Sequence, residues 1–135
     1  MEGQGLLFDA SSLIHALKLR RPDLLYNGYV QWLTLYEAIN ALWEEVRLIK
    51  RISADEALKL TAVLRDVLGL VKILEVRGLE DEILRCALKH GLTAYDASYV
   101  VLAEKHGLTL VTEDRALRKV ASKLIKVVSL EELLH

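Results

Sequence analysis

Residues 5–13 are Gly5-Leu6-Leu7-Phe8-Asp9-Ala10-Ser11-Ser12-Leu13, and this stretch decides how the rest of the chain is interpreted. Its apolar run, Leu6 to Phe8, predicts a short buried strand that ends directly in the carboxylate of Asp9. Ser11 or Ser12 can then cap a helix. A strand, an acid and a helix start in this order are typical of an open parallel sheet, which presents functional groups at the carboxyl ends of its strands.

Length and composition predict one folded domain over residues 1–135. The 135 residues are 53% apolar and 27% charged, as in globular proteins. The formal net charge of -1 gives no overall attraction for nucleic acid or membranes, so a nucleic-acid site would have to be a local patch. The start has no basic signal-peptide region, and no apolar run approaches the roughly 18–20 residues of a membrane span. We therefore expect a cytoplasmic protein with no membrane partner.

Strands and helices alternate along the rest of the chain. The pattern predicts further strands at residues 29–33, 71–76, 108–111 and 125–128. It predicts helices at residues 35–51, 54–68, 79–90, 93–106 and 115–121, and after Ser129. This alternation favours an α/β fold with a parallel sheet of four or five strands.

Four acids stand where such a fold can bring them together: Asp9 after the first strand, Glu37 and Asp96 in the first turns of two helices, and Asp114 after the strand at 108–111. A purely structural explanation exists for three of them. Glu37 and Asp96 follow a threonine by three residues, which is the spacing of a capping box, and Asp114 can itself cap a helix. Asp9 is the exception, because the two serines are available as caps.

The four acids together indicate more than each does alone. Converging carboxylates repel one another strongly unless a cation neutralises them. Oxygen ligands without cysteine or paired histidine suit Mg²⁺ or Mn²⁺ better than zinc. Such an ion can activate water and stabilise the leaving oxygen in phosphodiester cleavage.

Four short motifs carry a resemblance to a known family. They are Phe8-Asp9-Ala10-Ser11, Tyr36-Glu37-Ala38-Ile39-Asn40-Ala41-Leu42, Tyr95-Asp96-Ala97 and Val111-Thr112-Glu113-Asp114. In this order they resemble the motifs of PIN-domain nucleases over essentially the whole chain, above all the small VapC-type toxins of toxin-antitoxin pairs. The resemblance implies a three-layer α/β/α sandwich with a mostly parallel sheet. It also implies Mg²⁺- or Mn²⁺-dependent endoribonuclease activity on RNA, frequent homodimers and inhibition by a small DNA-binding antitoxin protein.

The resemblance also assigns roles to residues. The metal-binding and catalytic acids would be Asp9, Glu37, Asp96 and Asp114. Ser11 and Thr112 match the family's small hydroxyl positions, which would support an acid or the water, and Asn40 lies one helical turn after Glu37. Nearby cations would hold the RNA, with Arg115 the best candidate beside Lys18, Arg20, Arg21, Arg118 and Lys119, although each can also be an ordinary solvated surface residue.

Other function classes fit less well. A phosphatase of the haloacid dehalogenase type needs a second acid two residues after the first, where this chain has Ser11. A response-regulator receiver needs paired acids at the first strand and a late lysine after a strand. The remaining alternative is a PIN-like domain that binds RNA or a partner protein without cutting. The apolar first half of the helix at 35–51, with Trp32, Tyr36 and Trp43, is expected to form a dimer or antitoxin surface.

Overall fold

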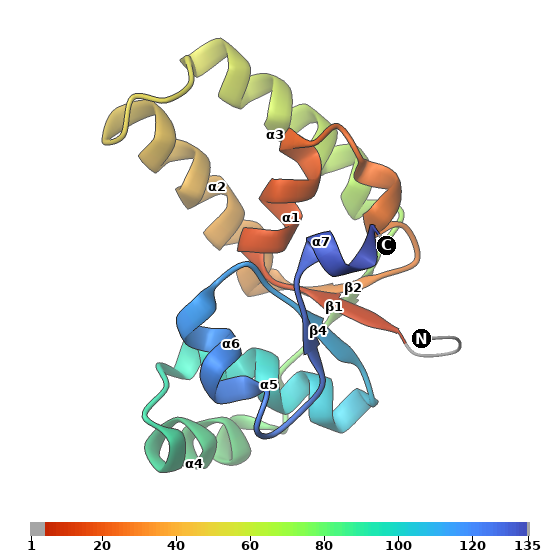
Figure 1. Ribbon diagram of the computed structural model, residues 1–135, viewed down its shortest axis with the longest axis vertical. Helices are drawn as coiled ribbons and strands as arrows, with labels where there is room; N and C mark the ends of the chain where they lie inside the picture. The colour runs from red at the N-terminus through yellow and green to blue at the C-terminus, as the bar shows by residue number, and fades with distance from the viewer. Residues whose placement is uncertain (1–4, 135) are drawn as a thin grey trace.

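Five short strands form one parallel sheet in the computed structural model, which describes residues 5–134 (Figure 1). The strands are β1 (Leu6–Phe8), β2 (Tyr29–Gln31), β3 (Lys72–Leu74), β4 (Thr109–Val111) and β5 (Val127–Val128). Their order is β3-β2-β1-β4-β5, and each neighbouring pair is parallel. The predicted α/β class and the predicted number of strands are confirmed.

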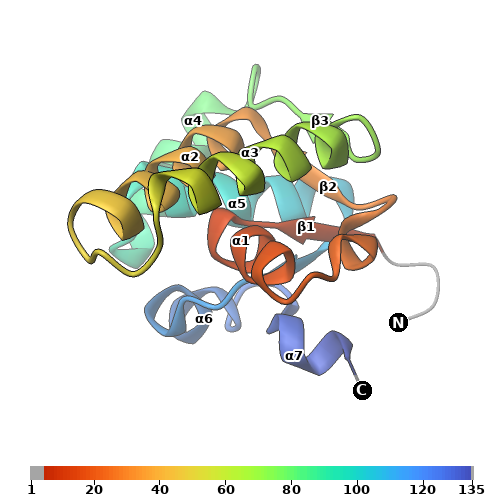
Figure 2. The same ribbon diagram turned by 90° about the horizontal axis from the view of Figure 1, so that it is seen from above.

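Helices cover both faces of this sheet. They are α1 (Ala10–Lys18), η1 (Pro22–Leu25, a 3₁₀ helix), α2 (Trp32–Arg47), α3 (Ala54–Leu68), α4 (Glu80–His90), α5 (Ala94–His106), α6 (Arg115–Ala121) and α7 (Leu130–Leu133). One layer contains α1, α2, α3 and α7, and the other contains α4, α5 and α6 (Figures 1 and 2). The result is the expected three-layer sandwich. Within residues 5–134, none of these helices is long and apolar enough to cross a membrane.

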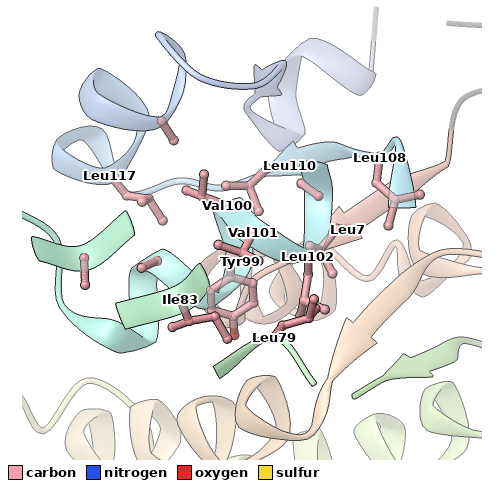
Figure 3. Close-up of a cluster of buried hydrophobic side chains, with 14 residues drawn as sticks. Leu7, Leu79, Ile83, Tyr99, Val100, Val101, Leu102, Leu108, Leu110 and Leu117 are labelled. Carbon is pink, nitrogen blue, oxygen red and sulfur yellow. The ribbon is translucent and has the colours of Figure 1, made fainter. Parts of the chain in front are cut away.

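The strand side chains divide the core into two halves. Leu7 and Leu110 pack with α4, α5 and α6, in the cluster that Figure 3 shows. Phe8 and Val111, one residue further along the same strands, pack on the opposite face with α1, α2 and α3. All four side chains are fully buried. A strand covered on both faces needs a continuous apolar run rather than an alternating one, which explains the sequence of β1.

The strand order reverses between β1 and β4. From β1 the chain builds outward through β2 and β3, and it then returns to place β4 and β5 on the other side of β1. Phe8 lies beside Val111, and the backbone N–H of Asp9 donates to the carbonyl of Val111 at 3.2 Å. Open α/β sheets bind ligands beyond the carboxyl ends of the strands at such a reversal. Asp9 directly follows β1 at this reversal, and residues 112–114 directly follow β4 there.

The start of α1 corrects one prediction. Asp9, and neither serine, is the N-cap, because its Oδ1 accepts the backbone N–H of Ser12 at 2.9 Å. The Ser12 hydroxyl is oriented toward the sheet, where it lies 2.8 Å from the carbonyl oxygen of Val111. A carboxylate at the end of the strand is already in place to bind the exposed N–H groups of the first turn, so the serines are not needed as caps.

The bounds of α2 correct a second prediction. The helix begins at Trp32 with Gln31 as its N-cap, so Thr34 lies inside the first turn and does not form a capping box with Glu37. Instead, the Thr34 hydroxyl accepts the backbone N–H of Gln31 at 3.2 Å. The helix ends at Arg47 and not at residue 51, because the backbone N–H of Arg51 turns back to the carbonyl of Glu45 at 2.8 Å. Glu37 is therefore left without a capping role.

Candidate functional site

The four predicted acids approach the same edge of the sheet from four segments of the chain. Asp9 caps α1, Glu37 lies in α2, Asp96 lies in the first turn of α5, and Asp114 caps α6. Partial burial is the main cause that raises the pKa of Glu37, and the charges of Asp9 and Asp96 add to it. Burial also raises the pKa of Asp96, with further contributions from Asp114 and Asp9. The carboxylates are therefore close enough to act on one another's protonation.

Asp9 is the most deeply buried of the four site acids. Its Oδ1 accepts from the Ser11 hydroxyl at 2.7 Å as well as from the Ser12 N–H, and its Oδ2 accepts from the Thr112 hydroxyl. These hydrogen bonds lower the pKa of Asp9, but burial outweighs them and the net direction is upward. This network fixes the orientation of the carboxylate before any ligand arrives.

Ser11 and Thr112 join the ends of β1 and β4 through this carboxylate. Each hydroxyl donates its proton to Asp9. Each hydroxyl oxygen also accepts a backbone N–H, Ser11 from Glu113 at 2.9 Å and Thr112 from Asp114 at 3.1 Å. The two predicted hydroxyl positions thus hold the turn that carries Asp114 against the first strand.

Glu37 is oriented by a tyrosine that the sequence interpretation did not identify. The hydroxyl of Tyr99, in α5, donates to Oε1 of Glu37 at 2.7 Å. The Thr34 hydroxyl lies 2.9 Å from the same Tyr99 oxygen, and it must be the donor because the Tyr99 proton is directed to Glu37. Burial and the adjacent Glu37 charge raise the pKa of Tyr99, so this tyrosine remains a donor. A buried tyrosine one turn after Asp96 is the signal that could have identified it, since such a hydroxyl needs a partner.

Asp96 and Asp114 differ in what holds them. The backbone N–H of Asp96 is bound by the Thr93 hydroxyl at 3.1 Å, which confirms the predicted helix start, while its half-buried carboxylate has no hydrogen bond among residues 5–134. The Asp114 carboxylate is exposed and accepts the N–H groups of Ala116 at 2.9 Å and Leu117 at 3.1 Å. The structural explanation for Asp114 as a helix cap is therefore correct, and only one of its oxygens is used.

This negative charge has no ion-pair partner among residues 5–134. Within the described residues, none of the four acids forms an ion pair with lysine, arginine or histidine. In the same part of the chain, there is no group of three or more Asp, Glu, His or Cys side chains whose present arrangement could hold a metal ion. The donor set is nevertheless chemically suited to a hard divalent cation, since all four side chains offer carboxylate oxygens.

Three of the predicted substrate-binding cations are engaged elsewhere. Lys18 pairs with the buried Glu45, and Arg21 forms an ion pair with Asp23 at 3.0 Å. Arg118 donates to the carbonyl of Thr112 at 3.0 Å and lies 3.6 Å from Glu132. The partners of Lys18 and Arg118 are distant in the chain or belong to the backbone, so the sequence alone could not identify them, whereas the partner of Arg21 is only two residues away.

Arg115 and Asn40 lie at the border of the acid site. Arg115 is exposed at the first position of α6, next to Asp114, and its side chain has no hydrogen bond or ion pair among residues 5–134. Asn40 is exposed one turn after Glu37, and its Nδ2 donates to Glu44 at 2.9 Å. Arg115 thus offers an exposed cation beside a site acid, whereas the Asn40 amide is held by Glu44, one turn further along α2.

A sequence model described as "PIN domain" matches residues 6–123. The chain belongs to the PIN domain family. The match contains all four acids, both hydroxyl residues and the whole of the strand reversal between β1 and β4. The family resemblance of the four motifs is therefore confirmed.

Two relatives from Pyrobaculum aerophilum are similar to this PIN domain. "Exonuclease VapC9" is 52% identical over 85 residues, which are 63% of this chain and 60% of that protein. "Ribonuclease VapC3" is 39% identical over 85 residues, which are 63% of this chain and 64% of that protein. The aligned part thus spans less than two thirds of the length of either relative.

Two solved structures share the fold over most of their length. The crystal structure of PAE2754 from Pyrobaculum aerophilum has a TM-score of 0.79 and 38% identity, covering 97% of this chain and 94% of that chain. The structure of FitAcB from Neisseria gonorrhoeae has a TM-score of 0.61 and covers 93% and 98%, respectively. At 19% identity the second likeness concerns the fold alone.

Proposed function

We propose that this PIN domain is a Mg²⁺- or Mn²⁺-dependent endoribonuclease that cleaves RNA phosphodiesters, and that it is the toxin component of a VapC-type toxin-antitoxin pair. The observation that supports this most strongly is the convergence of four acids, none of which has an ion-pair partner in the described part of the chain: Asp9, Glu37, Asp96 and Asp114. The names of the two similar proteins, an exonuclease and a ribonuclease of the VapC type, agree with nuclease chemistry.

Each residue has a defined task in this proposal. Asp9, Glu37, Asp96 and Asp114 would hold the divalent cation, which supplies an activated water and offsets charge on the phosphate. Ser11 and Thr112 keep Asp9 in one orientation by donating both hydroxyl protons to it. Tyr99 orients Glu37 by donating its hydroxyl proton to Oε1 of that residue. Arg115 attracts the negatively charged RNA backbone toward the acids, which alone would repel it.

The proposed partners are a small DNA-binding antitoxin and a second copy of the chain. The outer face of α2 supports an interface because Trp32, Ile39 and Trp43 are each about half exposed there. Light scattering at tens of micromolar tests the homodimer, for which we expect twice the mass of the 15.2 kDa chain. A mass of one chain would contradict the dimer and leave the nuclease proposal intact.

Cleavage of a mixed set of structured and single-stranded RNAs tests the proposed activity. We expect wild type to cut with Mn²⁺ and not with EDTA, and we expect Asp9→Asn to lose this activity while remaining folded. Asp23→Asn is the matched control, because Asp23 is an exposed acid of η1 whose carboxylate pairs with Arg21 and not with the site. Cleavage that persists in EDTA or in Asp9→Asn would refute a metal-dependent acid site.

A domain that binds RNA without cutting is the second candidate. The observation that favours it is the lack, among residues 5–134, of three side chains already arranged around a metal position. The presence of all four acids favours the nuclease. RNA binding without cleavage of any RNA in the set, at any Mn²⁺ concentration, would select the binding domain.

A further inference from the structure

A hollow of about 470 Å³ includes Glu37 in its lining and extends beyond the acid site described above. Its walls come from two helices, with Tyr36, Asn40 and Glu44 in α2 and Tyr95 at the start of α5. Clefts that bind small ligands measure about 300–1,000 Å³, so the hollow is large enough for one planar ring system. Because Glu37 belongs to both, the hollow opens directly onto the acids.

Two exposed aromatic rings border this hollow. The exposed fraction is 70% for Tyr36 and 62% for Tyr95. Each tyrosine directly precedes a site acid in the sequence, Tyr36 before Glu37 and Tyr95 before Asp96. Proteins that bind single-stranded nucleic acids stack the bases on exposed aromatic side chains of this kind.

The charge of the hollow decides which part of a nucleotide fits. Among the described residues that line it, Glu37 and Glu44 are acidic and none is basic, so a phosphate is repelled. Asn40 uses one N–H on Glu44, which leaves the side-chain oxygen of Asn40 and the second carboxylate oxygen of Glu44 as acceptors. Acceptors beside stacking rings suit a base that carries an amino group.

We propose that this hollow is a nucleobase subsite, in which one base of a single-stranded substrate stacks on Tyr36 and Tyr95 and donates its amino group to Asn40 or Glu44. The subsite rests on the proposed nuclease function, since it places the phosphate attached to that nucleotide beside Glu37 and Asp96. Cytosine, which carries an amino group, binds more tightly than uracil, which has a carbonyl oxygen at the same position.

A protein partner fits the adjoining surface better than this hollow. Further along α2, a second hollow is lined by Tyr36, Ile39, Asn40 and Trp43 and contains no carboxylate. That mainly apolar surface suits a protein interface, whereas two carboxylates beside stacking rings suit a base with donors. Trp43 therefore provides a matched control, as an exposed aromatic side chain on the same helix that does not border the base hollow.

Binding of labelled ten-nucleotide oligo(C) and oligo(U), followed by fluorescence anisotropy, tests the subsite. Ca²⁺ is added to offset the charge of the acids, and wild type is compared with Tyr36→Leu, Tyr95→Leu and Trp43→Leu. We expect wild type to prefer oligo(C), and each tyrosine variant to bind about ten- to one-hundredfold more weakly. Trp43→Leu binds like wild type. All three side chains are exposed, so the fold is expected to survive, and thermal unfolding verifies this.

The same set of variants separates the possible failures. If the tyrosine variants bind like wild type while Mn²⁺-dependent cleavage is still lost in Asp96→Asn, the subsite is refuted and the nuclease remains. If wild type neither binds nor cuts RNA, the nuclease function and the nucleobase subsite are both refuted. If Tyr36→Leu and Trp43→Leu both lower the molar mass and leave RNA affinity unchanged, the surface joins copies of the chain and the subsite is again refuted.

Discussion

At the scale of single residues, the hydroxyl of Tyr99 controls the orientation of Glu37. Tyr99→Phe keeps the buried ring and removes this hydrogen bond, so we expect Mn²⁺ affinity and cleavage to fall about ten- to one-hundredfold, the usual cost of losing a group that orients a metal ligand. Calorimetric titration with Mn²⁺ measures the affinity directly. Tyr29→Phe is the control, because Tyr29 lies in β2 and its hydroxyl accepts a hydrogen bond from Lys72 rather than contacting a site acid. Equal Mn²⁺ affinity in Tyr99→Phe and wild type would contradict the role of Tyr99.

At the scale of elements, the approach of β2 to β1 depends on Gly28. A Cβ at this position would lie 2.6 Å from Cε2 of the fully buried Phe8 and 2.9 Å from the carbonyl oxygen of Leu25. We expect Gly28→Ala to lower the free energy of unfolding by about 1–3 kcal/mol, because neither the ring nor the backbone can move freely. Urea denaturation measures the loss.

Gly69→Ala is the matched control for that loss. Gly69 has a φ of -76°, and its added Cβ would make only an ordinary contact, 3.5 Å from the carbonyl of Asp66. We expect no destabilisation, or a gain of about 0.4–1 kcal/mol from the less flexible unfolded chain. If the two substitutions change the free energy of unfolding equally, the tight space around Gly28 is not the cause of the destabilisation.

The elements also show how far the sequence could predict this molecule. Apolar runs and helix periodicity gave the sheet class, because these patterns depend only on which residues are buried. The predicted caps of α1 and α2 were wrong. At α1 the serines and Asp9 have similar N-cap preferences, and at α2 the preferred Thr34 lies inside the first turn of a helix that begins after Gln31. The partner of Glu37 was missed because Tyr99 is 62 residues away, and only tertiary packing brings the two together.

At the scale of the whole molecule, the acid site makes stability depend on pH. Burial is the main cause that raises the pKa of Asp9, Glu37 and Asp96, so the folded protein retains protons that the unfolded chain has lost. Without a divalent cation, the free energy of unfolding therefore falls as pH rises from the ordinary carboxyl pKa of about 4 through the raised values. Asp23 and Glu132, whose pKa values are lowered by hydrogen bonds and opposite charge, contribute the opposite slope at lower pH.

Urea denaturation in EDTA from about pH 4 to pH 7 measures this dependence. We expect Asp96→Asn to be more stable than wild type at the upper end, because it removes one of the repelling charges. Added Mn²⁺ stabilises wild type there by binding the folded state. A wild-type stability in EDTA that rises over this pH range would contradict the account.

Four acids from four segments act as one metal site in this molecule if each contributes to Mn²⁺ affinity, which calorimetry on neutralised variants measures. Wild type is compared with Asp9→Asn, Glu37→Gln, Asp96→Asn and Asp114→Asn, with Asp23→Asn as the control acid outside the site. We expect wild type and Asp23→Asn to bind Mn²⁺ with the same affinity, and each of the other four variants to bind it more weakly. A wild type that binds no Mn²⁺, or four variants that bind it as wild type does, would contradict the claim.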